Sequence, residues 1–280
     1  IGLGYSGSPV VVLSNGNYAV ASAFWNGQMG AVTWVDGTTG RVSDYAANSN
    51  TNIISSTNSL VGGTPLDYVG WKVIALPGNG NYVVGGATLA TTPTATWVDG
   101  STGRVSDYAA KGNTNVVSAD NSLMGASDPY ALTNGNYAVA SGYYAGGGSQ
   151  RGVVTWMDGT TGLASDGTRI ISATNSIIGQ TNNDMIGQNG VIALPNGNYV
   201  IATFGWSLNT GAVTWVDGSN GATSNTSNVI SSANSVIGNS TGEQVGARVV
   251  VLTNGNYVIG SYNWRGAEAS FRTATGAATW

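Results

Sequence analysis

An internal repeat is the feature that most constrains the fold. Asn-Gly-Asn-Tyr occurs five times, Thr-Trp occurs five times, and Asn-Ser-(Leu/Ile/Val)-x-Gly occurs four times, always in this order. Ordered motifs at a period of about 60 residues indicate tandem structural units. The motif tyrosines are Tyr18, Tyr82, Tyr137, Tyr199 and Tyr257; the tryptophans are Trp34, Trp97, Trp156, Trp215 and Trp280.

Each unit is predicted to contain four antiparallel strands. In the fourth unit, a β-branched run at 191–194 is followed by Asn196-Gly197 and a second run at 198–202. The Asn-Gly pair predicts a two-residue type I′ hairpin turn, which needs positive φ twice. A third strand is expected at 211–216, ending in Asp217-Gly218, and a fourth at 229–237. The 43 glycines favour many short strands joined by tight turns.

Strands that are apolar on both faces must stack sheet against sheet. Small residues recur just after each Tyr-x-Val, as in Ala21-Ser22 and Gly85-Gly86, and allow close approach of neighbouring sheets. The predicted fold is therefore all-β, a five-bladed β-propeller of four-stranded antiparallel blades. The alternative is an open superhelical array of the same β units.

The chain is predicted to be a single repeat domain, 1–280, with units at about 9–62, 72–125, 129–179, 190–238 and 248–280. The last unit stops at the close of its third strand. Residues 1–8 are one candidate for the fourth strand of that unit. The other sources considered are a longer array and a neighbouring molecule, because an unpaired strand edge recruits other chains.

Composition excludes several functional classes. The absence of Cys and His excludes disulfides, Cys/His zinc sites and hydrolase triads that use histidine. The net charge of −4, with scattered basic residues, argues against nucleic acid as a partner. No apolar run approaches the length of about 18 residues that membrane insertion needs. We identify no catalytic residue, no metal site and no cofactor, and expect that the protein is not an enzyme.

Two series of acidic residues recur. The turn aspartates Asp36, Asp99, Asp158 and Asp217 are interpreted as bonding their own backbone, because calcium needs six to eight oxygen ligands and each turn supplies one carboxylate. The second series precedes each new unit and is interpreted as fixing a loop through backbone N–H groups, with a ligand or metal role as the alternative. Its members are Asp67, Asp184 and Glu243, with Asp128 in the corresponding loop of a shorter unit.

A third series marks candidate binding residues. Seven positions after the motif tyrosines lie Trp25, Leu89, Tyr144, Trp206 and Trp264. Four of the five are aromatic, and each is expected where a variable loop leaves the second strand. Aromatic rings beside amides suit a sugar, and variable loops on a rigid scaffold often carry binding. The candidate site comprises Trp25, Tyr144, Trp206, Trp264, Asn26, Asn263 and Arg265; the alternative is that the rings only cap the sheet ends.

The succession NGNYxV, GAVTW and NSLVG resembles a bacterial tandem repeat of unknown function found in secreted, filamentous-haemagglutinin-like surface proteins. The resemblance spans essentially the whole chain and implies an extracellular or cell-surface location, but it brings no activity and no functional residues. Two functions are therefore expected. The first is a structural or adhesive surface module that self-assembles through its incomplete unit. The alternative is a multivalent carbohydrate-binding propeller, so the candidate partners are glycans or copies of the chain itself.

Overall fold

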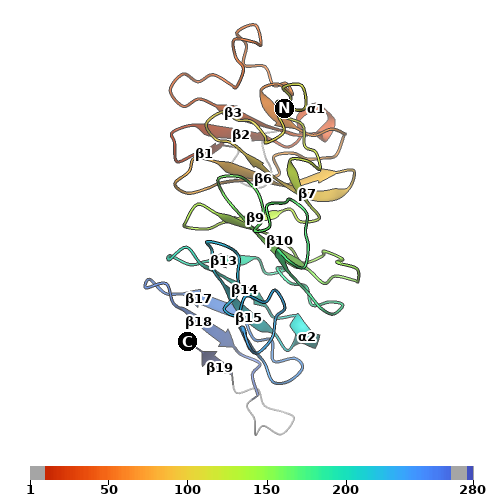
Figure 1. Ribbon diagram of the computed structural model, residues 1–280, viewed down its shortest axis with the longest axis vertical. Helices are drawn as coiled ribbons and strands as arrows, with labels where there is room; N and C mark the ends of the chain where they lie inside the picture. The colour runs from red at the N-terminus through yellow and green to blue at the C-terminus, as the bar shows by residue number, and fades with distance from the viewer. Residues whose placement is uncertain (1–9, 266–275, 280) are drawn as a thin grey trace. The chain divides into compact units, whose positions relative to one another are not determined.

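A computed structural model of the protein describes residues 10–265 and 276–279 (Figure 1). In these residues the strands form five antiparallel sheets, in each of which neighbours in sequence are neighbours in the sheet. Four sheets have four strands, and the fifth has three among the described residues. The all-β class and the four-stranded antiparallel unit are thus confirmed. The segment proposed to complete the fifth unit, residues 1–8, lies outside the described residues.

The strands of each sheet follow directly along the chain. The first sheet contains β1 (Val10–Val12), β2 (Tyr18–Ser22), β3 (Ala31–Val35) and β4 (Ser59–Val61). The second contains β5 (Lys72–Ala75), β6 (Tyr82–Leu89), β7 (Thr92–Val98) and β8 (Ser122–Met124). The third contains β9 (Asp128–Ala131), β10 (Tyr137–Ser141), β11 (Val153–Met157) and β12 (Ser176–Ile178).

The later sheets repeat this plan, and two helical turns complete the secondary structure of the described residues. The fourth sheet contains β13 (Val191–Ala193), β14 (Tyr199–Thr203), β15 (Ala212–Val216) and β16 (Ser235–Ile237). The fifth contains β17 (Arg248–Val251), β18 (Tyr257–Ser261) and β19 (Ala277–Thr279). These turns are α1 (Trp25–Gln28) and α2 (Trp206–Asn209), and because their inner residues have positive φ, neither is a regular α-helix.

The chain divides into two compact units, and the division falls within the third repeat. The first unit comprises Ile1–Ala131, Gly135–Tyr137 and Met157–Ile171; the second comprises Leu132–Asn134, Ala138–Trp156 and Ser172–Trp280. The arrangement of the five sheets as a propeller or as an open array therefore stays a prediction.

The hairpin between the first two strands differs from the predicted type I′ turn. In the fourth repeat, Ala193 pairs with Tyr199, Leu194 N–H donates to Asn198 O at 2.8 Å, and Gly197 N–H donates to Leu194 O at 3.2 Å. Gly197 has a φ of +91°, whereas Asn196 is not among the residues with positive φ. This is a three-residue loop with a left-handed glycine, in which only the glycine needs positive φ.

The fourth strand is shorter than predicted, because the motif asparagine holds a turn before it. β16 begins at Ser235, whereas the expected strand began at residue 229. Asn234 Oδ1 accepts the backbone N–H of Ser231 at 3.0 Å, and its Nδ2 donates to Val229 O at 2.9 Å. Ser235 then shares a 2.8 Å hydrogen bond with Thr214, the residue before the motif tryptophan. The Asn-Ser motif therefore fixes where the last strand begins and how it pairs.

The motif tyrosines of the inner repeats belong to the core. Tyr82, Tyr137 and Tyr199 are at most 1% exposed. Inside each of the two compact units, apolar clusters join successive sheets. Val200 of β14 and Ile259 of β18, for example, share one cluster. In these three repeats the motif tyrosine is therefore a packing residue of the core.

Candidate functional site: the contact between successive repeats

In the first four repeats, the Asn-Gly-Asn, Trp and Asp-Gly motifs meet at one end of the sheet, here termed the turn end. In the second repeat it consists of hairpin residues 79–81, Trp97 and turn residues 99–103. Asn79 Oδ1 accepts the N–H of Asn81 at 3.0 Å, which closes the hairpin. Asn81 Oδ1 accepts the N–H of Gly100 at 3.0 Å, which fixes the Asp-Gly turn of the same repeat. The Nδ2 groups of both asparagines remain available to the next repeat.

A carbonyl oxygen of the next repeat accepts hydrogen bonds from three donors. Asn79 Nδ2, Asn81 Nδ2 and Trp97 Nε1 all donate to Gly159 O, in the Asp-Gly turn of the third repeat, at 3.0, 2.9 and 2.9 Å. The equivalent donors of the first repeat reach Gly100 O at 2.8, 3.0 and 2.8 Å. In the third repeat, Asn134 and Trp156 reach Gly218 O at 2.7 and 2.8 Å. We term this arrangement the turn–tryptophan contact.

A second glycine of the same turn lies against the tryptophan of the preceding repeat. These glycines have positive φ, and a methyl group added to any of them would lie 2.4–2.6 Å from the tryptophan Cβ. The pairs are Gly103 with Trp34, Gly162 with Trp97 and Gly221 with Trp156. Only glycine combines that backbone conformation with so close an approach. The contact therefore depends on close steric fit as well as on hydrogen bonds.

The opposite end of each sheet, here termed the loop end, carries the predicted aromatic series. The backbone oxygen of each aromatic residue accepts the N–H of the glycine that precedes the third strand, at 3.0–3.1 Å. The pairs are Trp25 with Gly30, Tyr144 with Gly152, Trp206 with Gly211 and Trp264 with Gly276. These residues thus mark the base of loops of different length, and their side chains are half-buried.

The second repeat departs from this pattern, as Leu89 does in the sequence. Leu89 pairs with Thr92 across a two-residue turn, in which Ala90 and Thr91 have φ of +49° and +73°. This is the type I′ geometry. The strands β6 and β7 are long, and their register shifts between Val84 and Ala87. A regular hairpin therefore replaces the loop that the aromatic residue closes elsewhere.

The polar members of the candidate site lie next to the aromatic residue of their own repeat in the sequence. Asn26 is exposed on α1 and contacts Met29 Sδ at 3.2 Å through Nδ2. Asn263 Nδ2 donates to Gln244 Oε1 at 2.7 Å, and Arg265 is half-buried. Their role in binding stays a prediction.

The turn aspartates bond their own backbone, as interpreted from the sequence. Asp36 Oδ1 accepts the N–H groups of Thr38 and Thr39 at 2.8 and 2.9 Å, and these bonds lower the pKa of Asp36. Equivalent bonds are made by Asp99, Asp158 and Asp217. In the described parts of the chain, no group of three acidic side chains could hold a metal ion.

The second acidic series fixes the loops before each new repeat. Asp67 and Asp184 are 2% and 1% exposed, and each accepts two backbone N–H groups at 2.8 Å. Glu243 is 1% exposed and accepts the N–H of Asn239 at 2.7 Å. The loop-fixing interpretation is confirmed for these three.

Asp128 was grouped with this series wrongly. It begins β9, pairs with Lys72 and accepts a hydrogen bond from the hydroxyl of Tyr130. Lys72 Nζ also lies 4.4 Å from the Tyr130 ring centroid. Asp128 therefore links the second and third repeats by charge rather than holding a loop.

Sequence reasoning missed an aromatic pocket at the loop end. Phe24, Tyr68 and Trp71 meet edge to face, with ring centroids 5.9–6.3 Å apart. With Gly86 they line a pocket of about 340 Å³. Trp71 is 41% exposed. The only signal in the sequence is that tyrosine and tryptophan follow Asp67 here, where the later repeats carry other residues.

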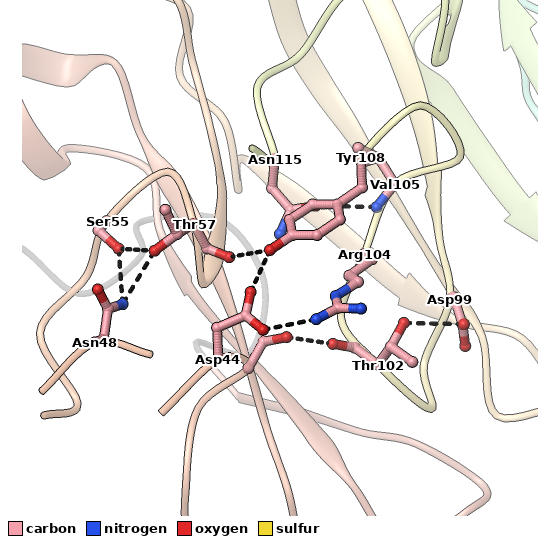
Figure 2. Close-up of polar contacts among 11 residues, drawn as sticks. Asp44, Asn48, Ser55, Thr57, Asp99, Thr102, Arg104, Val105, Tyr108 and Asn115 are labelled. Carbon is pink, nitrogen blue, oxygen red and sulfur yellow. Dashed lines mark hydrogen bonds and ion pairs between the residues drawn. The ribbon is translucent and has the colours of Figure 1, made fainter. Parts of the chain in front are cut away.

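Sequence reasoning also missed a polar network between the first two repeats, shown in Figure 2. Asp44 accepts hydrogen bonds from Arg104 Nη2 at 2.6 Å and from the Tyr108 hydroxyl. Burial and the Asp44 hydrogen bond raise the pKa of Tyr108. The sequence Arg-Val-Ser-Asp-Tyr-Ala-Ala, at 41–47 and again at 104–110, was the available signal. Because the carboxylate is paired with groups of its own chain, the network serves to join two loops.

The geometry defines a class, an all-β tandem-repeat protein whose repeats are joined by their own motif residues. No helix in the described residues has the length and apolar character to cross a membrane. A family model described as a repeat of unknown function (DUF5650) matches residues 12–71, 131–188, 193–247 and 251–280. These matches cover more than half of the chain, which therefore belongs to this family. No curated protein matches it.

The family matches leave out residues 72–130. This segment contains the second repeat, in which the regular hairpin at Ala90 and Thr91 replaces the loop. The predicted membership in a tandem-repeat family of unknown function is confirmed.

Proposed function

We propose that the chain is a non-enzymatic structural repeat module that acts outside the cell or at its surface, where it serves adhesion. The turn–tryptophan contact carries the proposal. Asparagine, tryptophan and turn glycine, the residues that recur in the sequence, bind the protein's own backbone. Such repeats depend on their neighbours and lengthen by adding units. The resemblance to bacterial surface proteins supports the location.

The decisive experiment compares two glycines with the same backbone conformation. Gly221 (φ +79°) lies against Trp156, whereas a methyl group on Gly40 (φ +67°) meets nothing within 4 Å. Gly40→Ala should cost about 1 kcal/mol through backbone strain. Gly221→Ala should cost about 3 kcal/mol, because the added methyl also separates two repeats. Equal losses in urea unfolding would overturn the proposed role of the contact.

The arrangement of the repeats can be tested separately. A compact chain of 280 residues, such as a closed five-bladed propeller, should have a radius of gyration of about 19 Å. An open superhelical array of the same sheets should give a larger value. Small-angle X-ray scattering distinguishes the two.

Self-assembly through the fifth sheet is the proposed route to a longer surface structure. β19 is the last strand of a three-stranded sheet among the described residues, and a strand edge pairs readily with another chain. Native mass spectrometry and electron microscopy should show oligomers that grow with concentration. Monomers alone at high concentration would contradict this part of the proposal.

Carbohydrate binding is the second candidate function, and the pocket formed by Phe24, Tyr68 and Trp71 favours it. Three rings around a shallow pocket, one of them exposed, resemble the stacking surfaces that sugars use. A glycan array should give binding that Trp71→Ala abolishes at this pocket. Trp206→Ala and Trp264→Ala should reduce it if the aromatic series contributes further sites. An array without any signal would remove this candidate.

A further inference from the structure

The fourth repeat has the donors of the turn–tryptophan contact, but the described residues offer them no acceptor. Its hairpin is formed as elsewhere, with Asn196 Oδ1 accepting the N–H of Asn198 at 3.2 Å and Asn198 Oδ1 accepting that of Gly218 at 3.1 Å. Among the described residues, however, no acceptor is found for Asn196 Nδ2, Asn198 Nδ2 or Trp215 Nε1. The equivalent groups of the earlier repeats reach a glycine oxygen of the following repeat.

A hollow of about 400 Å³ lies beside these donors. Its walls are Asn196, Trp215 and Val236 from the fourth repeat and Gly255, Asn256, Tyr257, Ile259 and Thr279 from the fifth. In the earlier contacts, the Asp-Gly turn lies between two equivalent walls, the tryptophan of the preceding repeat and the hairpin of its own repeat. Gly100 and Gly103, for example, lie between the Trp34 side chain and the hairpin residue Gly80.

The register of the fifth sheet indicates which strand position would pair with Tyr257, a residue of the hollow. Ile259 pairs with Thr279, as Ile201 pairs with Thr214 in the fourth sheet. By the same register Tyr199 pairs with Val216, directly before the Asp-Gly turn. By this register, a residue added directly after 280 would pair with Tyr257. Tyr257 is half-buried, whereas Tyr199 is 1% exposed.

We propose that this hollow is a binding site for a turn of the pattern Asp-Gly-x-x-Gly that enters as a continuation of β19. The first glycine would present its carbonyl oxygen to Trp215 Nε1 and the two asparagine amides. The second would lie against the Trp215 side chain, where Gly221 lies against Trp156 in the preceding contact. The inference rests on the proposed function, because it assigns the partner of the same contact in the fourth repeat.

The test extends the full chain by Val-Asp-Gly-Thr-Thr-Gly, which copies residues 35–40. The control extension, Val-Asp-Ala-Thr-Thr-Ala, changes only the two glycines. The first extension should slow hydrogen exchange of the Trp215 indole N–H at least about tenfold, because a buried hydrogen bond exchanges only after opening. It should also raise the Tm by about 2–4 °C, whereas the control should change neither.

Equal effects of the two extensions, or no effect of either, would overturn the proposal. If the unextended chain self-associates and its Trp215 indole N–H becomes protected as concentration rises, the occupant is a second copy, and the proposal is also wrong. Gly221→Ala separates this failure from failure of the proposed function. A large loss of stability in that variant, together with inert extensions, would leave the contact intact and remove only the binding site.

Discussion

At the turn end of the first three repeats, equivalent asparagine and tryptophan donors reach one glycine oxygen at 2.7–3.0 Å. At the loop end, the connection between the second and third strands changes from repeat to repeat. The second repeat has a two-residue turn at Ala90 and Thr91 where the fourth has the helical turn α2. Both repeats nevertheless form four-stranded sheets of the same order. The turn end therefore carries the joining of repeats, and the loop end is free to vary, as binding loops do.

Alkaline pH should give the largest effect and act at the turn end. Burial raises the pKa of Tyr82, Tyr137 and Tyr199, which follow the hairpins. Because the folded state favours the neutral phenol, their contribution is complete below about pH 10 and is lost as pH rises above it. Three such groups should cost about 4 kcal/mol per pH unit in that range.

Urea unfolding between about pH 9 and 12 measures this loss. Tyr82→Phe should remove about a third of the slope. At neutral pH the same change should be neutral or stabilising by about 1 kcal/mol, because the Tyr82 hydroxyl is buried without a hydrogen-bond partner among the described residues. If Tyr82→Phe leaves the pH dependence of the unfolding free energy unchanged, another part of the molecule unfolds first at high pH.

The buried acid at the base of the loop end should tolerate substitution less well than an exposed acid in a turn of the turn end. Asp184 is 1% exposed and accepts backbone N–H groups from Gln180 and Thr181 at 2.8 Å and from Ser207 at 3.0 Å. Asp184→Asn would place an amide donor among these donors and should cost about 2–4 kcal/mol. Asp158→Asn, in an exposed turn that asparagine also fits, should cost less than about 1 kcal/mol. Similar losses in chemical denaturation would break the distinction between buried and turn acids.

Two tryptophans at the turn end test the contact at the level of one hydrogen bond. Trp97 Nε1 donates to Gly159 O at 2.9 Å, whereas no acceptor for Trp215 Nε1 is found in the described part of the chain. Trp97→Phe should therefore lower the free energy of unfolding by about 1–2 kcal/mol. Trp215→Phe should leave it nearly unchanged. A loss in Trp215→Phe as large as in Trp97→Phe would show that ring size, not the hydrogen bond, sets the stability.

The sequence predicted the all-β class and the order of strands, because the motifs recur locally and alternate with turn residues. It predicted the wrong hairpin at Asn196-Gly197, since the two turn types share these residues and differ only in which of them has positive φ. It also treated the asparagines as turn residues alone. The repetition of both Asn79 and Asn81 was the missed signal, because a turn of this kind needs only its glycine in a special conformation.

The loop end was predictable in position but not in content. The spacing of seven residues located the base of each loop correctly, because it counts residues along one strand. The pocket at Phe24 and Trp71 and the pairing of Asp44 with Arg104 join residues 47 and 60 positions apart. Such pairs depend on how consecutive repeats pack, and the sequence of a single repeat does not determine that packing.

The smallest effect is expected from a substitution that introduces the residue found at the equivalent position of another repeat. Trp206→Leu gives the fourth repeat the side chain that Leu89 has in the second, and Trp206 is half-buried at the base of α2. The free energy of unfolding should fall by less than about 1 kcal/mol, whereas Trp156→Leu at the turn end, 7% exposed, should cost about 3 kcal/mol. Thermal and urea unfolding of the two variants measure this. A large loss of stability in Trp206→Leu would mean that the ring supports the sheet end. The aromatic series would then be structural rather than a binding surface.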